Sequence, residues 1–239
     1  MINRRVMMLT PAGLATLLGS CFFGYESVPD YRYRLMIEVN TPEGVRTGSS
    51  VISASAAQSD SDSMTPNAVG VGFKGQAAGV DLPNGVTLYA LLSSPTNADW
   101  AGWIMIWLTP DRVFRRLKAY YPDMVADRRR HILGKKFRRG YGPGSNPSES
   151  PIPYLLKMKG ADWHTAELVD PDQFEASLGP GYHLKSISAQ ITDDEATLDL
   201  KKRLPWLGNY PEPAIPKHFE YRGNTVLVLH GFFYRGSNR

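Results

Sequence analysis

The sequence has a single cysteine among 239 residues, and this scarcity excludes several classes of protein. One cysteine cannot form an internal disulfide or supply the sulfur ligands of a structural zinc site. No apolar run reaches the roughly 20 residues that a membrane-spanning helix needs. No repeat of fixed period is visible, which argues against solenoids and propellers. The fold must therefore depend on packing of its apolar residues, which make up 42 % of the chain.

The first twenty residues have the pattern of an export signal. Arg4 and Arg5 precede a short apolar stretch, 6–18, which small residues follow. The segment Leu18-Gly19-Ser20-Cys21 resembles a bacterial lipobox, and this resemblance implies diacylglyceryl transfer to Cys21 and cleavage before it. The alternative is an apolar N-terminus with a chance cysteine. We predict a lipoprotein signal peptide at 1–20, a tether at 21–30 and one domain at 31–239.

Alternating apolar residues predict antiparallel strands in the first part of this domain. Tyr31–Val39 alternates with a period of two, and so places its apolar side chains on one face. The turn Thr41-Pro42-Glu43-Gly44 leads into a second strand over 45–54, and Asn84-Gly85 favours another hairpin. We predict an α+β fold of antiparallel β-hairpins with a few amphipathic helices. Residues 140–153 are dense in Gly, Pro and Ser, and form either a loop or a linker between two lobes.

Helix signals occur in two parts of the chain, residues 99–132 and residues 192–204. We expect one helix over 99–108, which carries three tryptophans that favour core packing. A second helix begins at Thr109-Pro110-Asp111, with an apolar stripe that extends to Tyr121, and a third covers 123–132. The capping box Thr192-Asp193-Asp194-Glu195 predicts a helix that extends to about Leu204.

Positive charge is concentrated in residues 112–139. This segment contains eleven Lys and Arg against two Asp, whereas the chain without residues 1–20 has a formal charge of only +2. A basic amphipathic segment suits an anionic surface, and each basic residue near anionic lipid contributes about 1 kcal/mol. The alternative is a solvated helix face. The predicted anionic-surface residues are Arg112, Arg115, Arg116, Lys118, Arg128, Arg129, Arg130, Lys135, Lys136, Arg138 and Arg139.

Motifs for catalysis are weak. Residues 70–75 match G-x-G-x-x-G, but a polar loop precedes them and a hairpin follows, so a glycine-rich strand edge is the better interpretation. Asp162, His164 and Glu167 could form a metal or acid–base cluster, although surface polarity explains them more simply. We therefore predict no catalytic residue, cofactor or metal, and leave enzymatic activity as an open alternative.

Several segments are similar to uncharacterised exported proteins of Gram-negative bacteria, a family without an established activity. The similarity is carried by Tyr31–Leu35, Thr41–Gly44, Thr47–Val51, Asp170–Gly181 and Ile191–Leu207. It implies an envelope location and supplies no catalytic residue.

The export signal and the basic segment together predict a non-enzymatic lipoprotein of the cell envelope, facing the periplasm. We expect it to dock on an anionic membrane surface or on an acidic partner protein. We do not expect it to bind nucleic acid. Phe22 after the cysteine slightly favours the outer membrane, because some lipoproteins retained in the inner membrane have aspartate there. The alternative function is a periplasmic hydrolase or a small-ligand-binding module.

Overall fold

Antiparallel β-sheet dominates the fold. A computed structural model describes residues 25–61, 64–110, 115–134, 152–208, 217–228 and 230–236. In these residues the larger sheet contains β1 (Tyr25–Ser27), β2 (Tyr31–Thr41), β3 (Gly44–Ser59), β4 (Val69–Gln76), β7 (Arg130–His131), β10 (His183–Ile191) and β13 (Tyr234–Arg235). Their order is β13-β4-β3-β2-β10-β7, and β1 pairs with β3 beyond the end of β2.

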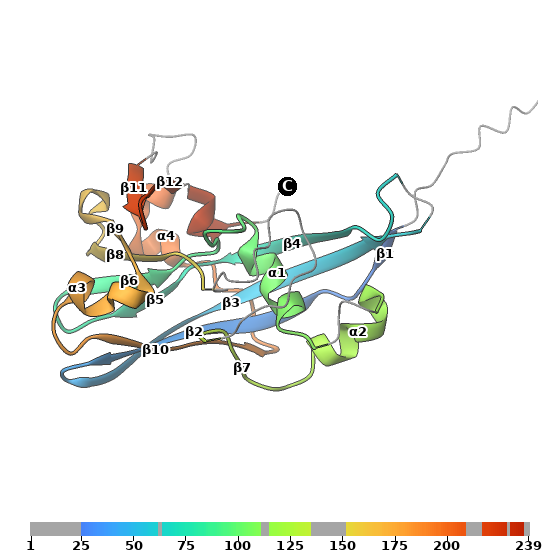
Figure 1. Ribbon diagram of the computed structural model, residues 1–239, viewed down its shortest axis with the longest axis horizontal. Helices are drawn as coiled ribbons and strands as arrows, with labels where there is room; N and C mark the ends of the chain where they lie inside the picture. The colour runs from blue at the N-terminus through green and yellow to red at the C-terminus, as the bar shows by residue number, and fades with distance from the viewer. Residues whose placement is uncertain are drawn as a thin grey trace, which may run out of the picture.

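A smaller sheet packs on one end of the larger one. It has the order β5-β6-β8-β9, with strands β5 (Ala78–Asp81), β6 (Val86–Ala90), β8 (Leu155–Lys159) and β9 (Glu167–Val169). A separate pair consists of β11 (Lys217–Tyr221) and β12 (Asn224–Val228). Figure 1 shows the long strands β2, β3 and β4 running along the molecule, with β1 and α2 at the end opposite to the smaller sheet.

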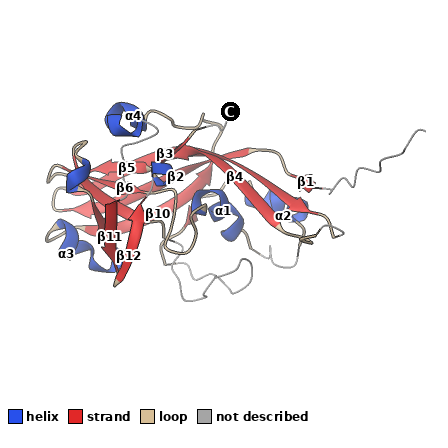
Figure 2. Ribbon diagram, turned by 90° about the horizontal axis from the view of Figure 1, so that it is seen from above, coloured by secondary structure: helices blue, strands red, loops and turns tan. Residues whose placement is uncertain are grey.

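The helices are short. They are α1 (Trp100–Trp107), α2 (Leu117–Met124), α3 (Phe174–Leu178) and α4 (Leu200–Arg203), with 3-10 turns η2 (Trp163–Thr165), η3 (Pro171–Gln173), η4 (Pro205–Gly208) and η5 (His230–Phe232). Figure 2 shows α1 and α4 on opposite sides of the long strands. The predicted class, antiparallel sheet with a few helices, is thus confirmed, with a balance that is mainly β.

Two hydrophobic cores hold the layers together. The first lies between the larger sheet and the cover formed by α1, α2 and the smaller sheet. Alternation along β2 supplies Tyr31, Tyr33, Leu35, Ile37 and Val39, all at most 6 % exposed, as the sequence predicts. Each such side chain contributes about 1.5–3 kcal/mol on burial. The second core lies on the other face of the smaller sheet, against α4 and the C-terminal strands.

Both sheets combine strands from either side of residues 140–153, where the sequence places a loop or a linker. Strand β8 follows that segment and pairs with β6, which precedes it; β10 likewise pairs with β2. Residues 135–151 themselves lie outside the described part of the chain.

The predicted tether already contributes to the sheet at its far end. Tyr25 pairs with Ser59, Ser27 pairs with Ala57, and Val28 donates a backbone hydrogen bond to Ala56. Within the predicted tether, residues 25–27 therefore form a strand of the larger sheet, while residues 21–24 lie outside the described part of the chain.

Two expected helices near the basic segment differ from the prediction. The Thr109 hydroxyl donates to the Met105 carbonyl at 2.8 Å and so closes α1, whereas the described part of the next helix begins at Leu117. The helix expected over 123–132 is wrong. Arg130 and His131 instead pair with β10, and this edge-strand pairing prevents a helix.

The helix expected from Thr192 is also wrong over most of its length, because only Leu200–Arg203 is helical. The Thr192 hydroxyl instead accepts the Asp194 backbone N–H at 3.2 Å in a local turn, and the Asp194 carboxylate forms an ion pair with Arg34. Thr197 exchanges two hydrogen bonds of 2.9 Å with the Val51 backbone, and these hold the segment along β3. Long-range pairing thus replaces the local capping signal.

Candidate anionic-surface site

Six of the eleven predicted anionic-surface residues lie in the described part of the chain. The described ones are Arg115, Arg116, Lys118, Arg128, Arg129 and Arg130; the lipid-attachment residue Cys21 and Arg112, Lys135, Lys136, Arg138 and Arg139 lie outside the described residues. The structure brings the first three together at the start of α2, and the last three on the segment that leads into β7. Of these six, only Lys118 lies within a helix.

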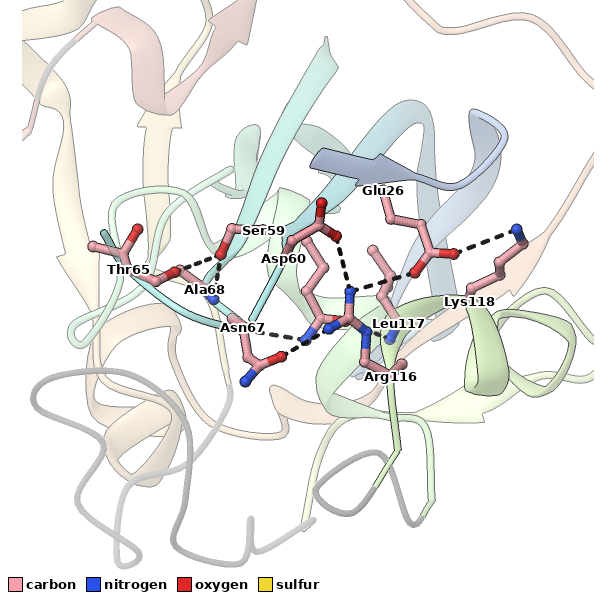
Figure 3. Close-up of polar contacts among 10 residues, drawn as sticks. Glu26, Ser59, Asp60, Thr65, Asn67, Ala68, Arg116, Leu117 and Lys118 are labelled. Carbon is pink, nitrogen blue, oxygen red and sulfur yellow. Dashed lines mark hydrogen bonds and ion pairs between the residues drawn. The ribbon is translucent and has the colours of Figure 1, made fainter. Parts of the chain in front are cut away.

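Arg116 is the centre of the polar network at the start of α2 (Figure 3). Its guanidinium donates to Asn67 Oδ1 at 2.9 Å, and lies 3.6 Å from a Glu26 carboxylate oxygen and 3.5 Å from one of Asp60. These partners come from β1 and from the connection between β3 and β4. Arg116 therefore ties three separate parts of the chain together.

Lys118 and Arg115 also have acidic neighbours. Lys118 Nζ lies 3.3 Å from Glu26, but the lysine side chain is 74 % exposed while that of Glu26 is 31 % exposed. Arg115 lies 2.8 Å from Asp123. Exposed pairs of this kind contribute only about 0–1 kcal/mol each. The most exposed charge of this group is thus the Lys118 ammonium.

Gln58, which the sequence analysis missed, positions α2. Its side chain is 7 % exposed, and its Oε1 accepts a hydrogen bond of 2.8 Å from the Leu117 backbone N–H. Its Nε2 donates to the Asn67 carbonyl at 3.2 Å. The N-cap residue Arg116 supplies no side-chain cap, so this glutamine satisfies an N–H at the start of the helix. No local sequence signal marks a partner that is 59 residues away.

Arg129 faces the larger sheet. Its Nε donates to Ser188 Oγ at 2.9 Å, and its Nη2 lies 3.9 Å from Glu38. A hydrogen bond of 2.5 Å from the Ser186 hydroxyl, helped by Lys185 and Arg129, lowers the pKa of Glu38 although partial burial opposes this. The Arg129 guanidinium is therefore engaged in an intramolecular network around the Glu38 carboxylate, although its side chain is 38 % exposed.

Arg130 is buried and is not available to an external surface. It is 5 % exposed, and its Nη2 donates to the Asp123 carbonyl at 2.6 Å. Its Nε and Nη1 have no hydrogen-bond partner among the described residues. Burial, and then the positive charge of Arg128, lowers the pKa of the Arg130 guanidinium to about 10. The prediction that every cation of this run faces an anionic surface is thus wrong for Arg130.

Asp162, His164 and Glu167 do not converge on one point. The Asp162 carboxylate accepts the His164 backbone N–H at 2.9 Å and so caps η2. Glu167 instead pairs with Lys157 Nζ at 2.8 Å. In the described ranges, no group of three His, Cys, Asp or Glu side chains could hold a metal ion.

Two surface cavities are lined by described residues. One, of about 490 Å³, lies between α3 and the smaller sheet, and its lining includes Lys157, Lys159, Thr165 and Glu167. The other, of about 440 Å³, lies beside β1, where small and apolar residues of β3 and β4 border Tyr25. Asp162 and His164 line neither cavity.

Comparisons with protein-family models, curated proteins and solved structures found no match to this chain. The resemblance to exported proteins of Gram-negative bacteria therefore stays a prediction. Within the described part of the chain, no helix has both the length and the apolar character needed to cross a bilayer.

Proposed function

We propose that this protein is a non-enzymatic lipoprotein of the bacterial cell envelope, anchored through Cys21 and docked on an anionic membrane surface. One observation carries the docking part. Lys118 and Arg116 both contact Glu26, which lies only five residues after Cys21 in the chain. Exposed cations thus lie beside the strand that follows the proposed anchor, although the sequence separates them by about 90 residues.

Ion pairs moderate the electrostatic part of this function. Glu26, Asp60 and Asp123 lie within 4 Å of the cations at the start of α2 and cancel much of their charge. The highly exposed Lys118 remains suited to lipid phosphates, and attraction of this kind decreases with salt. We therefore expect the preference for anionic lipid to be moderate and salt-sensitive.

Two measurements test this function. The intact mass of protein extracted from membranes should show loss of residues 1–20 and a gain of acyl mass; a chain that keeps its first methionine and has no lipid would contradict the anchor. The acylated protein extracted from membranes is then reconstituted in vesicles of phosphatidylglycerol or of phosphatidylcholine, and exposed to an amine-reactive label.

The label distinguishes docking from simple attachment. We expect Lys118 to be labelled several-fold less on phosphatidylglycerol than on phosphatidylcholine, because anionic headgroups cover it. Lys202, an exposed residue of α4, is the matched control and should react equally on both. Equal labelling of Lys118 on the two lipids would show that the anchored domain does not dock on anionic headgroups.

The second candidate is a small-ligand-binding module, and the cavity beside α3 favours it. Its volume falls within the range of small-molecule sites. Lys157 is 20 % exposed there and also donates to the Ser177 carbonyl at 2.7 Å. A small carboxylate that raised the unfolding temperature in the native chain, but not in Lys157→Met, would support this function. The absence of any such shift across a set of small carboxylates would count against it.

A further inference from the structure

Two large apolar side chains are exposed at the same end of the molecule. Tyr25 in β1 is 66 % exposed, and Met64, which follows β3, is 88 % exposed. Exposed side chains of this size occur singly on most soluble proteins, and a pair at one end deserves a physical explanation.

Strand pairing and hydrogen bonds hold these two positions close together. Tyr25 pairs directly with Ser59. The Ser59 hydroxyl donates to the carbonyl of Thr65, the residue next to Met64, and accepts the Ala68 N–H at 2.9 Å (Figure 3). Thr65 and Ala68, which follow Met64, are therefore held against Ser59, the strand partner of Tyr25.

Cations lie at the same end of the molecule as this apolar pair. Glu26 follows Tyr25 in β1, so its side chain points to the opposite face of the strand from the tyrosine ring, and there it contacts Lys118 and Arg116. Asn67, three residues after Met64, also binds Arg116. We call the set Tyr25, Met64, Arg116 and Lys118 the tip surface. An aromatic ring and a flexible apolar side chain at the same end as ammonium and guanidinium groups match the chemistry of a membrane interface.

The covalent chain limits how far this surface can lie from a lipid anchor. Four peptide units join Cys21 to Tyr25, and they span at most about 14 Å even when fully extended. Strand β3 has 16 residues, so its other end, near Val45, lies about 45 Å away along the strand. An anchor at Cys21 therefore brings the tip surface to the bilayer much more readily than the opposite end.

We propose that the tip surface is the part of the domain that contacts an anionic bilayer, with Tyr25 and Met64 entering the interface and Lys118 meeting lipid phosphates. This proposal rests on the proposed function, because it takes Cys21 as the lipid attachment site. It adds an orientation, with the long strands directed away from the membrane. It also adds an apolar contact, which salt does not screen.

Lipid crosslinking tests the orientation directly. The acylated protein extracted from membranes is reconstituted in phosphatidylglycerol vesicles that contain a phospholipid with a photoreactive group in the upper acyl chain. After irradiation, lipid adducts are located by mass spectrometry. We expect adducts at Tyr25 and Met64 at least tenfold above those at Val45 and Leu227, which are exposed apolar residues elsewhere, at 49 % and 39 %. The ratio should persist at 1 M salt.

Matched variants complete the test. Met64→Glu should lower the adduct yield at Tyr25 several-fold, whereas Val45→Glu should leave it unchanged. Adducts concentrated at Val45 or Leu227, or spread evenly, would overturn the proposed orientation. If Lys118 is still protected from the amine label in that case, the docking function stands and only the tip-surface proposal, with its orientation and apolar contact, fails. If the protein carries no lipid, both proposals fail.

Discussion

Gln58 offers the sharpest test of how this fold positions its basic helix. The side chain is buried in β3 and satisfies two backbone groups, the N–H of Leu117 and the carbonyl of Asn67. Replacement by alanine removes both hydrogen bonds and leaves no side chain that could replace them. A buried backbone N–H without a partner costs about 1–3 kcal/mol.

The expected cost of Gln58→Ala follows from these two groups. The hydrogen bond from the Leu117 N–H is buried, so its loss should carry most of the penalty, while the part-buried Asn67 carbonyl can recover some hydration. We expect a loss of about 2–3 kcal/mol in the free energy of unfolding. For a domain of this size that corresponds to a decrease in Tm of about 4–12 °C.

Urea and thermal unfolding followed by circular dichroism measure this loss. Gln190→Ala is the matched control, because Gln190 makes an exposed hydrogen bond of 3.2 Å to Asp127 and should change stability by less than about 0.5 kcal/mol. Gln58→Glu retains the acceptor for Leu117 and should lose less than Gln58→Ala. If the two alanine variants were equally stable, the reasoning that Gln58 caps α2 would be refuted.

Two further predictions concern the sheets. Glu38→Gln should lose about 1–2 kcal/mol at pH 7, because the ionised carboxylate has a lowered pKa in the fold. That contribution is present above the unfolded pKa of 4.5 and is lost as pH falls through the folded value, so urea unfolding at pH 3 should show a smaller difference than at pH 7; an equal difference at both pH values would contradict it. Gly48→Ala should lose about 3 kcal/mol or more, because its Cβ would lie 2.0 Å from the Gly79 carbonyl oxygen in β5. Gly70→Ala, whose Cβ meets nothing within 4 Å, is the control, and similar losses in both variants would argue against the close approach of β3 and β5.

Periodic patterns predicted the parts of the fold that alternate strictly. The five apolar side chains of β2 are buried because a period of two places them on one face of a strand, whatever lies far away in the chain. The helix over 99–108 was also predicted nearly to its ends, and most of its apolar residues are buried in α1 (Trp100–Trp107). The alternation in β2 and the apolar composition of α1 are local properties, so both can be recognised in the sequence without knowledge of distant contacts.

Capping signals failed where distant strands compete for the same backbone. Thr192 and Asp194 form a local turn, but Arg34 and Val51 of the larger sheet hold the following residues extended. The run before Ile132 likewise joins β10 as an edge strand. Capping signals depend on residues within about ten positions of each other, and therefore carry no information about partners that are distant in the sequence.

Charge counting along the sequence had the same weakness at the candidate site. Within 112–139 only two acids oppose eleven bases, yet the described bases meet Glu26, Asp60 and Glu38 from other parts of the chain. Formal charge in a window therefore overstates the positive potential at the surface. The composition located the basic residues correctly, but only the fold distinguishes the exposed Lys118 from the buried Arg130.

Two buried glutamines of the larger sheet, Gln58 and Gln76, explain where its surface helices begin. Gln76 in β4 accepts the Leu200 N–H at 2.7 Å, as Gln58 in β3 does for Leu117. Neither helix has a side-chain cap from its own N-cap residue. Both glutamines are at most 7 % exposed, so each forms a fixed point on the rigid sheet to which a helix start is attached. Because Gln58 also binds Asn67, the start of α2 and the connection between β3 and β4 are fixed to the same side chain, which holds Lys118 and Met64 at one end of the molecule.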